Sequence, residues 1–229
     1  MRSIEELAQV ENPAWPYCEL WASQSPNAVK ILPGQADGGK QMLYRLQMTA
    51  GSMLGGIVLN CGAITVDHGW IKVLGSGVPG LPGVADVNGF PSVPSETPPQ
   101  LPGMIVAIDA LGGQFAIDGG GLGVHPGEVC YWDPSTMAWV GLGAGHGALT
   151  EWLLTGDHTD FYADLRWDGW QDGAAALGIA QGISVYPFVW SQEFHTQKLF
   201  RKAVPLSEII DLNRTTAEQM GPELPLPWH

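Results

Sequence analysis

The sequence predicts an α+β fold, in which a mostly antiparallel sheet of meanders and hairpins is covered by several helices. Three observations favour this class. Short runs rich in β-branched and aromatic residues are separated by turns of three to five residues, which cannot hold a parallel crossover. Apolar residues recur at helical spacing before and after these runs. The 31 glycines and 18 prolines among 229 residues favour many short elements over long helices.

The first third of the chain is expected to begin with helices and to end in a meander. Ser3-Ile4-Glu5-Glu6 has the form of a capping box, and Asn12-Pro13 has the form of a second helix start. Asn60-Cys61-Gly62 and Asp67-His68-Gly69 are typical of tight turns between strands. The expected helices span residues 3–10, 13–22 and 40–48, and the expected strands span residues 29–32, 54–59, 63–66 and 70–74.

The central stretch, residues 104–155, is expected to form two hairpins followed by a helix. The first pair of strands flanks a Gly-containing loop at 109–113, and the second flanks Asp133-Pro134-Ser135-Thr136, where proline suits the second position of a type I turn. Leu149, Trp152 and Leu153 then lie on one face of a helix. The expected strands span residues 104–108, 114–117, 128–132 and 137–142.

The remaining segments connect or follow this sheet, and we expect one α+β domain over residues 1–229. The long connection at 75–103 holds seven prolines and six glycines, and loops of this length are usually functional or mobile. Asp157 to Arg166 is expected to be a helix with Asp157 as its N-cap. Pro187 marks the strand Gly182 to Phe188 as an edge or terminal strand. A final helix is expected at 205–212 and an extended tail at 221–229.

The net charge of −13 is unevenly distributed along the chain. Between Lys72 and Arg166 there is no Lys or Arg, whereas ten Asp or Glu fall in that interval. Nucleic-acid binding by this region is disfavoured, because it requires basic residues that displace counterions from phosphates. A protein with a basic surface is the natural partner of such a region. The alternative interpretation is that the acidity serves solubility alone.

The sequence also indicates the compartment and excludes some covalent chemistry. The sequence contains no run of about 20 apolar residues, so it predicts no membrane span. The N-terminus lacks the apolar segment of a signal peptide. Cys18, Cys61 and Cys130 are odd in number and widely spaced, which predicts reduced, buried thiols rather than disulfides or a zinc site. We therefore expect a cytoplasmic protein.

No catalytic or cofactor-binding motif is complete. The run from Gly34 to Gln41 is similar to a phosphate-binding loop, but Gln41 stands where a Ser or Thr hydroxyl would bind Mg²⁺. The six histidines show no metal-ligand spacing, so we expect no metal and no cofactor. The alternative is an enzyme or small-ligand binder, with a site near Asp67, His68 and His146 beneath the 75–103 loop.

One stretch combines carboxylates with aromatic side chains and is the predicted interaction face. Aromatic rings supply anchoring area at interfaces, and charges steer association. The alternative interpretation is that both tryptophans belong to the core and the acids form a solvated surface. The predicted face consists of Asp157, Asp160, Asp164, Trp167, Asp168, Trp170 and Asp172.

The residues also resemble two families. Gly112-Gly113, the glycines at 119–121, the run 128–134, Trp139 and the helix with Leu149, Trp152 and Leu153 resemble the SUKH superfamily. This resemblance implies a non-catalytic α+β interaction module, often an immunity protein that neutralises a toxin. Over nearly the full chain, including Asp67-His68-Gly69-Trp70 and 181–188, the sequence is similar to a bacterial family of unknown function. We therefore expect a monomer or weak homo-oligomer that binds a basic protein, with toxin immunity as one possible role.

Overall fold

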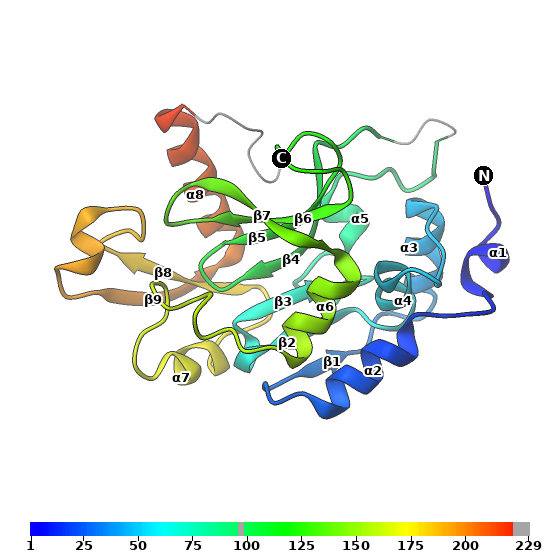
Figure 1. The fold of residues 1–229 in the computed structure, drawn as a ribbon, viewed down its shortest axis with the longest axis horizontal. Coiled ribbons are helices and arrows are strands. Elements are labelled where there is room, and N and C mark those ends of the chain that lie inside the picture. Colours follow the sequence, from blue (N-terminus) through cyan, green and yellow to red (C-terminus); the bar gives the residue numbers. More distant parts are fainter. Residues whose placement is uncertain (96–98, 222–229) are drawn as a thin grey trace.

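A computed structural model describes residues 1–95 and 99–221 and confirms the α+β class. A seven-stranded sheet forms the centre of the molecule (Figure 1), and its strands lie side by side in chain order, each antiparallel to its neighbours. Its strands are β1 (Lys30–Leu32), β2 (Ala63–Val66), β3 (Ile71–Leu74), β4 (Gly103–Asp109), β5 (Gln114–Asp118), β6 (Glu128–Asp133) and β7 (Ala138–Gly145). The meander and both central hairpins are therefore confirmed for β2 to β7.

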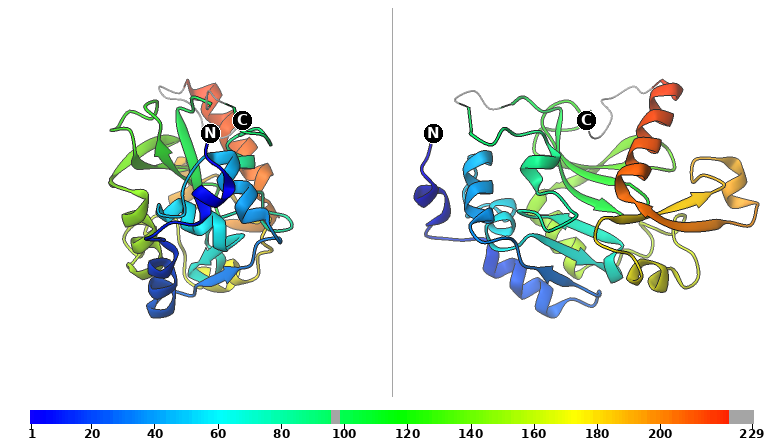
Figure 2. Two further views of the ribbon diagram at one scale, coloured as in Figure 1. Left: turned by 90° about the vertical axis from the view of Figure 1, so that its right-hand side faces the viewer. Right: turned by 180° about the vertical axis from the view of Figure 1, so that it is seen from behind.

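Helices cover both faces of the sheet. Helices α2 (Trp15–Gln24) and α6 (His146–Thr155) lie on one face, and α8 (Leu206–Met220) lies on the other (Figures 1 and 2). Gly112 fits beneath α8 because it has no Cβ, which would lie 2.9 Å from the Ile209 side chain. The other helices are α1 (Ile4–Ala8), α3 (Gly38–Leu46), α4 (Met53–Asn60), α5 (Val84–Val87) and α7 (Trp170–Ala175).

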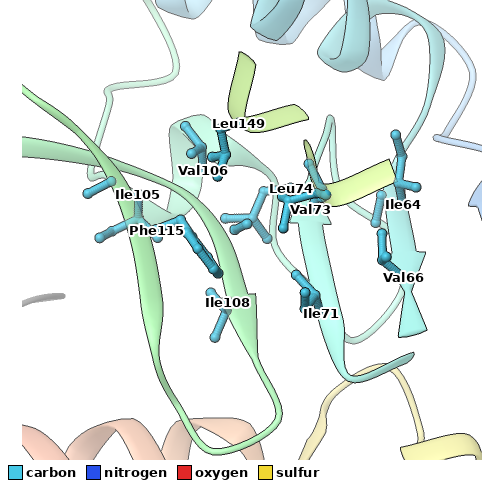
Figure 3. Packing of buried hydrophobic residues seen from close by; sticks show 14 of the residues in the cluster. Ile64, Val66, Ile71, Val73, Leu74, Ile105, Val106, Ile108, Phe115 and Leu149 are labelled. Atoms are coloured by element: carbon cyan, nitrogen blue, oxygen red, sulfur yellow. The ribbon is translucent and has the colours of Figure 1, made fainter. Parts of the chain in front are cut away.

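The main hydrophobic core lies between the sheet and its covering helices. Alternate residues of a strand point to opposite faces, so Ile64 and Val73, which are register partners, contribute to the same face. Figure 3 shows these side chains in the same buried cluster as Phe115 of β5 and Leu149 of α6. All four are at most 4% exposed. The spacing of apolar residues in the sequence therefore predicts which of these side chains are buried in the core.

At two of the predicted helix starts, the residues expected to cap the helix can be compared with those that do so in the structure. Ser3 and Glu6 form the expected reciprocal capping box at α1. Helix α2 begins at Trp15, with Ala14 as N-cap and Pro16 in the first turn, so Asn12 is not its cap. Proline is tolerated there because the first turn of a helix needs no N–H donor from it. The motif located the helix correctly but placed its start two residues too early.

The expected strand at 54–59 is wrong, because this segment is helix α4. The Ser52 side chain accepts a hydrogen bond from the Gly55 amide and caps the helix. A Cβ on Gly55 would lie 1.9 Å from the carbonyl oxygen of Thr49, and one on Gly56 would lie 2.9 Å from the Trp15 amide nitrogen. The two glycines therefore allow close packing of this helix, which a pattern of apolar residues alone does not indicate.

The structure also corrects the prediction for residues 157–166 and shows what the 75–103 connection contains. The predicted helix at 157–166 is a series of turns, in which His158, Tyr162 and Leu165 are buried and Phe161 is partly buried. The 75–103 connection contains α5 and the isolated bridge between Val78 and Leu81.

The last part of the chain forms a second, two-stranded sheet. Strand β8 (Gln181–Tyr186) pairs with β9 (Phe200–Pro205), and Pro187 directly follows β8, as expected of a terminal strand. Strand β9 was not predicted. The final helix extends to Met220, beyond the expected end at 212, and the tail prediction falls, apart from Gly221, outside the described residues.

The three cysteines are buried free thiols, as predicted, and burial raises the pKa of Cys18 and Cys61 to about 12. Such thiols stay protonated and unreactive near neutral pH. In the part of the chain that the structure describes, no helix is both long and apolar enough to span a bilayer.

Candidate functional site

Residues 157–172 present five aspartates to solvent. The segment leaves α6, continues through turns and enters α7, while His158, Tyr162 and Leu165 anchor it to the core. Turns bury one side of such a segment and leave the other side in water. The five exposed side chains, which we call the acidic face, are Asp157, Asp160, Asp164, Asp168 and Asp172.

The acidic face lies near two cations, Arg166 and Arg201, which stack on Trp170 and Trp167. Among the described residues, no Lys, Arg or His nitrogen lies within 4.0 Å of any of its five carboxylates. Hydrogen bonding to the Thr159 side chain and to the Thr159 amide lowers the pKa of the Asp157 carboxyl. The five carboxylates therefore have no direct ion pair among the described residues, and salt or a basic partner would reduce the repulsion between them.

The two tryptophans of the predicted interaction face are half-buried rather than freely exposed. Both pack edge-on against the fully buried Trp70, with ring centroids 5.7 Å away for Trp167 and 5.4 Å away for Trp170. The guanidinium carbon of Arg201 lies 4.1 Å from the Trp167 ring, and that of Arg166 lies 3.8 Å from the Trp170 ring. The protein's own arginines thus occupy positions that a partner's cations would take.

Asp67 lies beneath the acidic face and joins the turn before β3 to the 157–172 segment. Its Oδ2 atom accepts a hydrogen bond from Arg166 at 2.6 Å and lies 2.8 Å from His158 Nδ1. Burial by itself raises the pKa of Asp67, but the hydrogen bonds and charges of His158 and Arg166 outweigh burial and hold that pKa below its ordinary value. The sequence did not indicate this cluster, because Asp67 lies 91 residues from His158 and 99 residues from Arg166 along the chain.

A second cluster of buried polar side chains spans the sheet from Lys72 on β3 through Asp109 on β4 to Tyr131 on β6. Asp109 Oδ2 accepts hydrogen bonds from Tyr131 at 2.6 Å and Tyr162 at 3.3 Å, and backbone amides of the turn at 111–113 bind Oδ1. Complete burial raises the pKa of Asp109 despite these donors. Lys72 is 1% exposed, and burial lowers its pKa to about 8 even though Asp109 acts in the opposite direction.

The alternative site near Asp67, His68 and His146 is not assembled as expected. Asp67 and His68 precede β3, whereas the 75–103 connection leaves its far end and packs against Cys61 and Gly62 through backbone hydrogen bonds. The expectation that this loop covers Asp67 and His68 is therefore wrong. His68 is exposed, and no hydrogen bond or ion pair among the described residues joins it or Asp67 to His146.

The ring nitrogens of His158 and His146 differ in their surroundings. His158 Nδ1 faces Asp67 and Nε2 lies 3.1 Å from the Trp152 carbonyl oxygen, so both nitrogens are engaged. Burial lowers the pKa of His146 to about 4, and neither of its ring nitrogens has a hydrogen-bond partner. A general base needs a free ring nitrogen, so the engaged ring of His158 is not suited to this role.

Two surface pockets lie elsewhere. One of about 210 Å³ between β7 and α6 is lined by apolar residues, among them Leu142, Trp152 and Phe161. Another of about 420 Å³ lies between residues 80–82 and the start of α8. Neither is lined by Asp67, His68 or His146, so neither supports the alternative site.

Comparison with known proteins identifies relatives whose functions are also unknown. Residues 4–209 match the family described as protein of unknown function DUF2625. The chain is 32% identical over 212 residues to the uncharacterized protein YbfG of Escherichia coli (strain K12), covering 93% of this chain and 95% of YbfG. It is also 32% identical over 189 residues to an uncharacterized protein of Haemophilus influenzae, covering 82% of this chain and 81% of that protein. No solved structure matches.

Proposed function

Because the chain belongs to the DUF2625 family, whose function is unknown, we propose a function from the geometry of this chain itself. We propose that it is a non-catalytic module that binds a basic protein through the acidic face. The observation that carries this proposal is the set of five exposed aspartates without an ion pair among the described residues. Opposite charges on a partner would relieve their repulsion and accelerate encounter.

The interior beneath the acidic face supports a binding role rather than chemistry. Asp67, Arg166 and the surrounding tryptophans fix the segment that carries the aspartates, so the charges are displayed on a rigid support. A preorganised surface binds at a lower entropic cost than a mobile one. The buried residues Asp67 and Arg166 would therefore hold the aspartates of the acidic face in position for recognition of a partner.

A basic toxin is the more specific partner that we propose. The glycine turns, hairpins and helix of residues 112–153 resemble the SUKH superfamily, whose members often act in toxin immunity. An acidic face is suited to blocking a basic toxin surface, because charge complementarity gives both speed and specificity.

The test is capture of a partner from a lysate of the bacterium that carries the chain, followed by affinity measurement with the purified partner. We expect a basic protein whose affinity falls at least tenfold as NaCl rises from about 0.05 to about 0.5 M, since salt screens exposed charges. Changing Asp160→Lys and Asp164→Lys should weaken binding by a further tenfold or more at low salt.

The matched control changes Glu5→Lys and Glu11→Lys, which alter the net charge equally at exposed positions in and just after α1, the helix at the opposite end of the molecule from α7 (Figure 1). We expect this variant to keep the wild-type affinity within about twofold. Equal loss in both variants would mean that overall charge, not the acidic face, determines binding. Affinity that rises with salt would contradict the proposal altogether.

A further inference from the structure

The β8–β9 hairpin is a basic projection on an acidic protein. It extends from the end of the molecule that also holds α7, away from α1 (Figures 1 and 2). Residues 181–205 contain Lys198, Arg201 and Lys202 but one acidic residue, Glu193, whereas the whole chain has a net charge of −13. Lys198 and Lys202 are exposed, and neither forms an ion pair among the described residues.

Exposed aromatic side chains accompany these cations. Tyr186 and Phe200 are register partners on the hairpin and are 62% and 64% exposed. Register pairs alternate between the two faces, so the next pair on their face is Ser184 and Lys202. Phe188 stacks on Trp190 just beyond β8, with ring centroids 4.7 Å apart. Exposed aromatic rings such as Tyr186 and Phe200 are typical of the centre of a protein interface, and charged side chains without ion pairs are typical of its rim.

The need to prevent an exposed edge strand from pairing with other strands explains only part of this surface. Lysine and proline on an exposed edge prevent pairing with other strands, and β9 carries both types of residue. Protection does not explain Tyr186 and Phe200, because exposing large aromatic rings favours association instead of preventing it. The hairpin is therefore better explained as a docking surface, which we define as Tyr186, Lys198, Phe200 and Lys202.

We infer that the hairpin docks on the acidic face of a second copy of this chain. This inference rests on the proposed function, because it names a basic partner for the acidic face. The charges are complementary: two unpaired lysines on the hairpin face five unpaired aspartates, and the aromatic pair supplies apolar area that charges alone do not. The overall charge of the chain disfavours a nucleic acid at the same surface, since a polyanion would be repelled.

The placement of the two surfaces allows a closed dimer. Arg201 stacks on Trp167, so the hairpin and the acidic segment are neighbours at one end of the molecule (Figure 1). Arg201 and Lys202 point to opposite faces of the hairpin, which leaves the Lys202 face directed away from the chain's own acidic segment. A two-fold axis at this end would place the hairpin of each copy on the acidic face of the other.

The test measures molar mass by light scattering after size exclusion, at several protein concentrations up to about 200 μM and at about 0.05 and 0.5 M NaCl. We expect a dimer at low salt whose dissociation constant rises at least tenfold at high salt. Two charge-reversed variants, K198E/K202E and D160K/D164K, should each be monomeric where the wild type is dimeric. Their equimolar mixture should restore a dimer, because each hairpin then meets a face of opposite charge, and this restoration excludes misfolding as the cause of the losses.

Several outcomes would overturn the inference: a monomeric wild type at the highest concentration, a dimer that survives K198E/K202E, or a mixture that stays monomeric. Binding of a labelled single-stranded oligonucleotide by the wild type but not by K198E/K202E would also overturn it. The E5K/E11K variant is the control and should dimerise like the wild type. The proposed function is tested separately, because K198E/K202E keeps the acidic face and should still bind a basic partner protein.

Discussion

At the scale of single residues, Asp67 should be the most consequential charge in the molecule. Its carboxylate binds Arg166 and His158, and removing one member of a buried charged group leaves the others uncompensated. We expect Asp67→Asn to lower the free energy of unfolding by about 3 kcal/mol at pH 7, as measured by urea denaturation. The matched control is Asp37→Asn, because Asp37 also has a left-handed backbone but is exposed, and this change should have little effect.

The pH dependence of the Asp67 variant has a definite sign. The pKa of Asp67 is lowered in the folded protein, so its contribution to stability is present above the unfolded pKa of about 4 and is lost as pH falls through the folded pKa. The difference between wild type and Asp67→Asn should therefore shrink below about pH 4. A difference that stays constant from neutral to strongly acidic pH would argue against a charged Asp67 as the cause.

Lys72 should have the opposite effect on stability at neutral pH. Burial lowers its pKa to about 8 from 10.5, so its charged form is disfavoured in the folded protein. Changing Lys72→Met should stabilise the protein at pH 7, by about 2 kcal/mol. The gain should diminish as pH rises from about 8 towards 10.5, because the wild-type lysine then becomes neutral while its unfolded form is still protonated. Lys40→Met, at an exposed position, is the control and should change stability by less than about 0.5 kcal/mol.

At the scale of elements, glycines distinguish helices that are packed closely from helices that are not. A Cβ on Gly55 of α4 would meet the Thr49 carbonyl oxygen at 1.9 Å, whereas a Cβ on Gly147 of α6 would meet no atom within 4 Å. Gly55→Ala should therefore destabilise the protein by at least about 2 kcal/mol. Gly147→Ala should be neutral or stabilise by about 0.5 kcal/mol, because alanine favours the helix. Thermal unfolding of both variants measures the contrast, and equal effects would show that close packing does not define α4.

The elements also explain what could be predicted from the sequence. Strands β2 to β7 were located because their turns carry Gly, Pro, Asn or Asp at short spacing. Helix α4 was not, because its apolar run with Gly55 and Gly56 has the composition of a strand and depends on tertiary contacts. The cluster of Asp67, His158 and Arg166 was missed for the same reason: its members meet only once the sheet and the 157–172 segment are packed together.

At the scale of the whole molecule, charge should set how stability responds to salt. The chain has 23 acidic and ten basic residues, and the acidic face holds five aspartates without an ion pair among the described residues. Raising NaCl from about 0.02 to about 0.5 M should increase the free energy of unfolding by about 1 kcal/mol, because salt screens their repulsion. The Asp160→Asn, Asp164→Asn and Asp168→Asn triple variant should lose about half of this increase. A control triple of Glu5→Gln, Glu11→Gln and Glu19→Gln removes as many charges from exposed positions elsewhere. If both triples respond alike, the repulsion is spread over the surface, and the acidic face is not the concentrated charge on which partner binding is proposed to depend.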